Sequence, residues 1–160
     1  MTGEGTSPQA TFVNAYVGAA LKQNTKGLYS VYVFPSAGMC TEMMIDENAV
    51  FTGACTASGV DVLFGAAARC GTEVDAYSGM DGRITAEIGR ACAKLSTSDM
   101  NEFCVELAKT YTDAVTSGKV PAGKKFNECY DLKSVRPSEE FENLWTKSKA
   151  KLTDLGLDFE

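Results

Sequence analysis

Apolar residues recur in two different rhythms along the first half of the chain. In residues 7–24 they recur at helical spacing behind Ser7 and Pro8, a capping hydroxyl followed by a proline that suits the first helical position. Residues 28–34 are instead dense in β-branched and aromatic side chains and stop at Pro35, as buried strands do. The pattern predicts a helix over 7–24 and a strand over 28–34.

The same alternation repeats further along the chain. A mixed apolar and acidic stretch that runs through Cys55 predicts a second helix, which Gly59 ends. Residues 60–65 form a short apolar stretch that predicts a second strand. A loop with several glycines then leads into a predicted helix over 81–95. Strands separated by helices imply parallel pairing with right-handed crossovers.

The last third of the chain has the pattern of helices alone. Asp99, with Glu102 three residues later, is typical of a capping box at the start of a helix over 97–117. Residues 121–123 predict a turn, and acids early and lysines late predict a final helix over 138–156.

These elements predict an α/β fold in one unit, residues 1–160. Within it, βα segments span residues 7–95 and C-terminal helices span residues 97–156. Two parallel strands are too few for an open parallel sheet, which is normally covered on both faces and has more strands. We therefore expect the missing strands to come from a longer natural chain or from a neighbour in an oligomer.

Composition and charge exclude several classes of function. The formal charge of -6 and the pI near 4.7 argue against a nucleic-acid or anionic-membrane partner, because such surfaces repel an acidic protein. The sequence has no apolar stretch long enough to span a bilayer and no signal-peptide pattern at its start. We expect a cytoplasmic protein.

The cysteines and the missing histidines narrow the possible chemistry. Six cysteines are widely spread and form no C-x-x-C pair, so we expect reduced, mostly buried thiols and no metal site or disulfide framework. The chain has no histidine, which removes the Ser-His-Asp triad and the Cys-His dyad. Acid and base work must come from carboxylates, tyrosines, lysines or another chain.

Candidate site residues follow the two predicted strands, because ligands of parallel α/β folds collect at the carboxyl ends of strands. The first set is Tyr32, Ser36, Cys40, Thr41 and Glu42, and the second is Arg69, Glu73, Asp75, Tyr77 and Asp81. Each has a structural alternative. Glu42 could bind a cationic substrate or simply begin a helix. Cys40 could be a nucleophile at a helix terminus or a packed thiol. Tyr32 could be a catalytic phenol or a packed residue of the strand.

Several motifs occur in one order along the chain. They are Pro35-Ser36-Ala37-Gly38-Met39-Cys40-Thr41-Glu42-Met43, then Thr56-Ala57-Ser58-Gly59, then Gly79-Met80 with Arg83, and then Pro121-Ala122-Gly123-Lys124 leading into Glu128-Cys129-Tyr130-Asp131. From Pro35 to the end this order resembles the C-terminal third of the monomethylamine methyltransferases of methylotrophic methanogens. The similarity before Pro35 is weak.

The resemblance implies the C-terminal part of a TIM (β/α)8 barrel with extra C-terminal helices. It also implies an activity, in which a methyl group passes from methylamine to the cobalt of a corrinoid carried by a cognate corrinoid protein. Family members hold pyrrolysine in the barrel mouth, in the half that this sequence does not cover. They have a glutamine where this chain aligns Tyr32.

Two hypotheses follow from the resemblance. In the first, the chain is the C-terminal portion of such an enzyme, with Tyr32 and Glu42 as catalytic residues and with Ser36, Cys40 and Thr41 binding substrate. It then binds no cofactor directly and its partners are methylamine, the corrinoid protein and further copies of itself. In the second, the chain is a non-catalytic module for oligomerisation or for docking the corrinoid protein.

Overall fold

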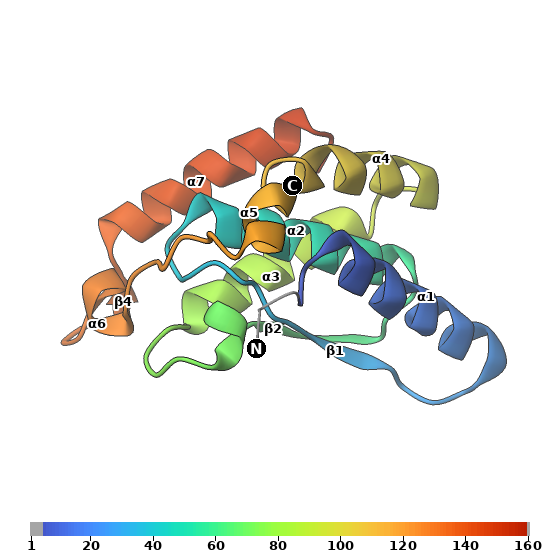
Figure 1. Ribbon diagram of the computed structural model, residues 1–160, viewed down its shortest axis with the longest axis horizontal. Helices are drawn as coiled ribbons and strands as arrows, with labels where there is room; N and C mark the ends of the chain where they lie inside the picture. Colours follow the sequence, from blue (N-terminus) through green and yellow to red (C-terminus); the bar gives the residue numbers. More distant parts are fainter. Residues whose placement is uncertain (1–4, 160) are drawn as a thin grey trace.

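A small parallel sheet lies at one side of the molecule, and the helices are stacked on one of its faces (Figure 1). The computed structural model describes residues 5–159. Its elements in chain order are α1 (Pro8–Asn24), β1 (Ser30–Val33), α2 (Glu42–Ala57), β2 (Val62–Ala66), the 3-10 turn η1 (Arg69–Gly71), α3 (Gly79–Cys92), α4 (Thr97–Ala108), α5 (Thr112–Ser117), α6 (Phe126–Cys129), β3 (Tyr130–Asp131), β4 (Arg136–Pro137) and α7 (Glu139–Asp154).

The sheet has two strands, as the hydrophobic pattern predicts. β1 pairs in parallel with β2, and Val31 lies opposite Leu63. An irregularity follows, because Gly65 adopts a φ of 99°, a left-handed conformation that glycine reaches without strain. The register then resumes with Val33 opposite Ala66. Residues 5–159 contain one further strand pair, the antiparallel hairpin of β3 and β4.

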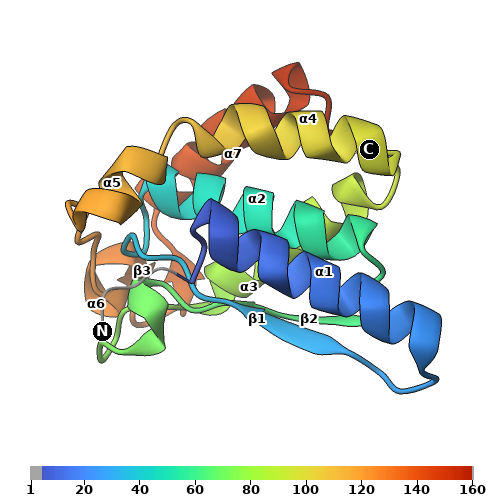
Figure 2. The same ribbon diagram turned by 45° about the vertical axis from the view of Figure 1, so that its right-hand side comes forward.

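Helix α2 is the centre of the packing. Most of its residues are buried, because it lies between the sheet and α4 and has α1 and α3 on its flanks (Figures 1 and 2). Phe51 and Cys55 face the strands and join Val31 and Val33 in a small apolar cluster. The rest of the helix joins the larger core that α3, α4 and α7 complete. No helix among residues 5–159 is long and apolar enough to cross a membrane.

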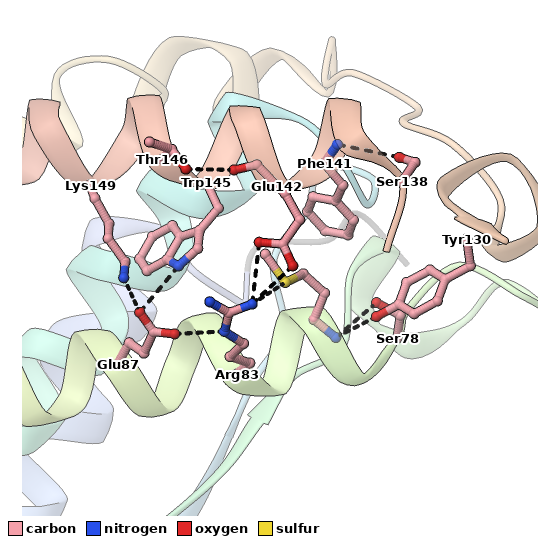
Figure 3. Close-up of polar contacts among 11 residues, drawn as sticks. Ser78, Arg83, Glu87, Tyr130, Ser138, Phe141, Glu142, Trp145, Thr146 and Lys149 are labelled. Atoms are coloured by element: carbon pink, nitrogen blue, oxygen red, sulfur yellow. Dashed lines mark hydrogen bonds and ion pairs between the residues drawn. The ribbon is translucent and has the colours of Figure 1, made fainter. Parts of the chain in front are cut away.

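The final helix is attached to α3 by a polar seam, drawn in Figure 3. Trp145 is buried, and its indole N–H donates to Glu87 Oε2 at 3.3 Å. Lys149 pairs with the same carboxylate, and Arg83 Nη1 lies 3.0 Å from Glu142 Oε1. The last helix therefore packs on this unit, through α3.

The structure differs from the predictions for the C-terminal region at three points. The expected helix over 97–117 is two helices, because the chain turns at residues 109–111 between α4 and α5. The cap of α4 is Ser96, whose hydroxyl accepts from the Asp99 amide, so Asp99 lies inside the helix. The region 97–156 also contains the hairpin β3–β4, where sequence reasoning expected no strand.

Candidate functional site

The loop after β1 is organised around a buried carboxylate. Glu47, in the second turn of α2, is fully buried and accepts hydrogen bonds from the amides of Ser36 at 2.6 Å and Ala37 at 2.9 Å. The hydroxyl of Thr6 donates to the same group. Burial raises the pKa of Glu47, and these donors oppose the rise. The carboxylate fixes the backbone where the first strand ends.

The loop after β2 contacts the first loop through Arg69. Its Nη1 donates to the carbonyl oxygen of Ser36 at 3.2 Å, and its Nε lies 2.8 Å from Glu73 Oε1. Lys125 Nζ reaches the other Glu73 oxygen at 2.8 Å. The hydrogen bonds from Lys125 and then Arg69 hold the pKa of Glu73 below its ordinary value. The two strand-end loops and the segment before α6 therefore form one connected edge.

Tyr32 lies on the face of the sheet that carries no helix. Its ring stacks on Phe64 at 4.6 Å between centroids and on Phe34 at 5.8 Å. Tyr32 remains 52% exposed, Phe64 54% and Phe34 40%. Large aromatic rings at this exposure, side by side on adjoining strands, form an apolar wall that no residue among 5–159 covers.

The other predicted site residues lie at the start of α2. Thr41 is the N-cap, and its hydroxyl accepts from the Met44 amide at 3.2 Å. Glu42 lies in the first turn and pairs with Lys151 of α7 at 3.0 Å. The hydrogen bond from Lys151 lowers the pKa of Glu42. Glu42 therefore serves the helix start and the α2–α7 contact.

Cys40 occupies a strained position in the loop. Its φ is 61°, a left-handed conformation that is uncommon outside glycine, asparagine and aspartate. Its half-buried thiol is hydrogen-bonded to Cys129, and burial raises the pKa of Cys40. All six cysteines are free and three of them are buried, among them Cys129. A raised pKa makes Cys40 a weak nucleophile.

The structure brings together some of the predicted residues and separates others. Ser36 and Arg69 meet at the strand ends, whereas Glu42 points to α7 and Tyr32 lies on the sheet face. Sequence reasoning missed Glu47. The sequence gives no clear signal for it, because Glu47 lies between Asp46 and Asn48 in a stretch of mixed apolar and acidic residues.

Asp81, from the second predicted set, is a buried group of a different kind. Its Oδ2 accepts from the Ser78 amide at 2.6 Å in a capping box at the start of α3. Its Oδ1 has no hydrogen-bond partner among the described residues. Burial raises the pKa of Asp81 to about 7, against the opposing bonds from Ser78. Residues 5–159 contain no group of three or more ligands suited to a metal ion.

This edge has the position of an active-site mouth in a parallel α/β enzyme, at the carboxyl ends of the strands. The fold and the edge together are those of part of a parallel α/β barrel. The family model for monomethylamine methyltransferase MtmB matches residues 1–157, so the similarity extends through the segment before Pro35. The chain belongs to the monomethylamine methyltransferase family.

Individual relatives agree with this assignment. Monomethylamine methyltransferase MtmB1 of Methanosarcina barkeri is 34% identical over 157 residues, which are 98% of this chain and 34% of the relative. MtmB1 of Methanosarcina acetivorans is 37% identical over 88% of this chain and 30% of its own length. The chain thus spans about a third of the length of the curated relatives it matches.

Solved structures confirm the predicted fold class. The crystal structure of the Methanosarcina barkeri monomethylamine methyltransferase superposes with a TM-score of 0.91 at 34% identity, over 96% of this chain and 33% of that one. A crystal structure of a hydroxylamine complex of MtmB superposes equally well. The α/β unit is the C-terminal part of a TIM barrel with extra helices.

Proposed function

We propose that this chain forms one wall of the active-site mouth of a monomethylamine methyltransferase. The substrate is monomethylamine, bound as its ammonium form; the methyl group passes to the reduced cobalt of a corrinoid that a partner protein carries, and the broken C–N bond releases ammonia. The other walls come from residues outside this chain. The chain itself binds no cofactor, and its role is to position substrate and partner.

One observation carries this proposal: the aromatic face of the sheet has no cover among residues 5–159. Tyr32 and Phe64 are more than half exposed, whereas the opposite face of the same strands packs into a closed cluster. A barrel strand has this asymmetry when its outer face meets helices and its inner face meets other strands' side chains. Membership in a family whose solved member is about three times as long supports the same view.

Under this proposal, the residues of the edge and of the sheet face have different roles. Glu47 and Arg69 hold the first loop, so that Ser36 keeps a fixed place at the mouth. Tyr32 faces the interior, where its hydroxyl can accept a hydrogen bond from an ammonium group or donate one. An amine is a poor leaving group, so it must be held in line with the attacking cobalt, which a rigid wall favours.

A reconstitution assay tests this proposal. The chain is mixed with the remaining two thirds of the Methanosarcina barkeri relative, monomethylamine and the reduced corrinoid protein, and methylcobalamin is followed by its absorbance. We expect transfer from the mixture and none from the chain alone. Turnover by the chain alone would contradict the proposal.

The same assay separates the two hypotheses for the chain. Co-elution of the two polypeptides in size-exclusion chromatography shows that the barrel has been assembled. Assembly without methyl transfer would support the non-catalytic module for oligomerisation or docking. A Tyr32→Phe variant serves as a matched control, because it keeps the aromatic wall and removes only the hydroxyl; slower transfer at unchanged assembly assigns the phenol a role.

Two further expectations belong to this proposal. A homo-oligomer would cover part of the exposed apolar surface, which light scattering after size-exclusion chromatography measures directly. A cytoplasmic location is the second expectation, and cell fractionation measures it.

A further inference from the structure

Positive charge is concentrated in one segment of an acidic chain. Residues 119–137 contain five lysines and arginines and two acids, while the whole chain has a formal charge of -6. Two of the cations, Lys124 and Lys125, are paired with Glu140 and Glu73. No ion pair joins Lys133 or Arg136 to any of residues 5–159. The hairpin of β3 and β4 therefore presents unpaired positive charge.

The same hairpin exposes apolar side chains. Leu132 and Val135 are 61% and 64% exposed, and they alternate with the cations Lys133 and Arg136 in the tip, residues 131–136. Apolar side chains ringed by charges are typical of protein-binding surfaces. The tip combines both features within six residues.

The tip is held in one conformation from within. Asp131 Oδ1 accepts from the Lys133 amide at 2.9 Å, and its Oδ2 accepts from the Ser134 hydroxyl at 3.0 Å. The Val135 amide donates to the Asp131 carbonyl oxygen at 2.8 Å. A loop fixed in this way loses little conformational freedom when it binds.

Val135, in the tip, has a backbone conformation that is unfavourable for valine. Its φ is 53°, a left-handed conformation in which a β-branched residue is a clear outlier and glycine or asparagine would be relaxed. The side chain fills no core position, because it is 64% exposed. Backbone strain of this kind is concentrated at functional positions. An exposed valine at a strained site points to a contact made outside residues 5–159.

The hairpin lies at the same end of the molecule as the carboxyl ends of the strands (Figures 1 and 2). Tyr130 connects it to the start of α3, since the phenol accepts from the Met80 amide at 2.8 Å. The Phe126 amide donates to the Asp75 carbonyl oxygen at 2.8 Å, which joins α6 to the loop after β2. The base of the hairpin is therefore anchored at the rim around the proposed mouth, and the tip extends from that base.

We infer that the tip, residues 131–136, is a docking surface for a protein partner with an acidic patch. The inference rests on the proposed function, under which that partner is the corrinoid protein that receives the methyl group. Charge complementarity favours an acidic patch, and Leu132 and Val135 favour a protein over a simple polyanion. The rest of the chain carries a net negative charge, so it repels nucleic acid and anionic membranes.

Binding measurements on matched variants test this inference. The chain is titrated with the purified corrinoid protein by isothermal calorimetry, and Lys133→Glu is compared with Lys26→Glu. Lys26 is also exposed but lies between α1 and β1, at the opposite end of the strands. We expect about a tenfold rise in Kd for Lys133→Glu and less than about twofold for Lys26→Glu. Added salt should weaken binding of the unaltered chain more than that of Lys133→Glu.

A second pair of variants tests the apolar part of the tip. Leu132→Ser should weaken binding about fivefold or more, whereas Leu28→Ser, at a position 82% exposed near the other end of β1, should not. Equal effects of the two variants in either pair, or no binding of the corrinoid protein to the chain, would overturn the inference. It would also be overturned if the tip variants lost binding to heparin, a simple polyanion, by the same factor as binding to the corrinoid protein. Binding that depends on the tip without methyl transfer in the reconstituted barrel would instead contradict the proposed function.

Discussion

The C-terminal helix and the sheet face of this chain differ in how their aromatic residues are packed. Trp145 and Phe141 of the C-terminal helix α7 are at most 1% exposed, and they pack against α3 and the core. On the sheet side Tyr32 and Phe64 are more than half exposed. Both pairs belong to regular elements, but only the first finds its packing partners inside the chain. The packing of α7 is therefore complete within residues 5–159, whereas the sheet face leaves large aromatic side chains exposed.

The largest expected effect separates these two sides by stability. Trp145→Ala should lower the free energy of unfolding by about 3–5 kcal/mol, because it removes a large buried side chain and leaves Glu87 without the indole donor. Phe64→Ala, on the sheet side, should cost less than about 1 kcal/mol, because the ring is 54% exposed. Denaturant unfolding followed by circular dichroism measures both. Similar losses would show that the sheet face is packed in solution.

The pH dependence of stability should reveal the buried Asp81. Its folded pKa of about 7 lies above the ordinary 3.8, so the folded chain keeps a proton that the unfolded chain loses. The free energy of unfolding should therefore fall, through this group, as the pH rises from about 4 to about 7, by at most about 4 kcal/mol. Asp81→Asn should flatten that part of the curve. Parallel curves for both proteins would contradict the assignment.

A smaller loss is expected where α7 meets α2 through an ion pair. Asp46 is buried, and Lys151 Nζ lies 2.7 Å from its Oδ2. Lys151→Met should cost about 2–3 kcal/mol near pH 7, because it leaves a buried carboxylate with the Thr110 hydroxyl alone. Lys109→Met, which removes an exposed pair with Glu106, is the control and should cost under about 0.5 kcal/mol. Thermal unfolding of both variants distinguishes the two results.

The smallest effect concerns the predicted catalytic carboxylate. Glu42→Gln removes an exposed partner of Lys151 and should change the free energy of unfolding by less than about 1 kcal/mol. In the reconstituted barrel it should leave methyl transfer unchanged, because the side chain points to α7. A loss of transfer without a loss of stability would return Glu42 to the site.

Much of the fold follows from local patterns in the sequence. Ser7 and Pro8 begin α1 as predicted, and the apolar runs before Pro35 and after Gly59 contain the two strands. The count of two parallel strands predicted an incomplete sheet, which the structure and the family's longer member agree with. These features depend on residues close in sequence, so a single sequence reveals them.

The rest depends on contacts between distant residues. The hairpin β3–β4 has strands of two residues each, too short for any periodicity, and Pro137 argues against a strand. Ser96 begins a run of several polar residues that could each cap α4, so the sequence alone does not single it out. Glu47 is an acid whose donors lie in the loop after β1, so its role becomes visible only when that loop folds over α2.

Amide hydrogen exchange tests the central claim most directly, since that claim is an unfinished sheet beside helices α2 and α7, which find their packing partners within the chain. In the isolated chain, the amides of β1 and β2 should exchange at least about a hundredfold faster than those in the middle of α2 and α7. Addition of the remaining two thirds of the family member should slow exchange in the strands and leave the helices unchanged. Strand amides as protected as those of α2 in the isolated chain would contradict the account.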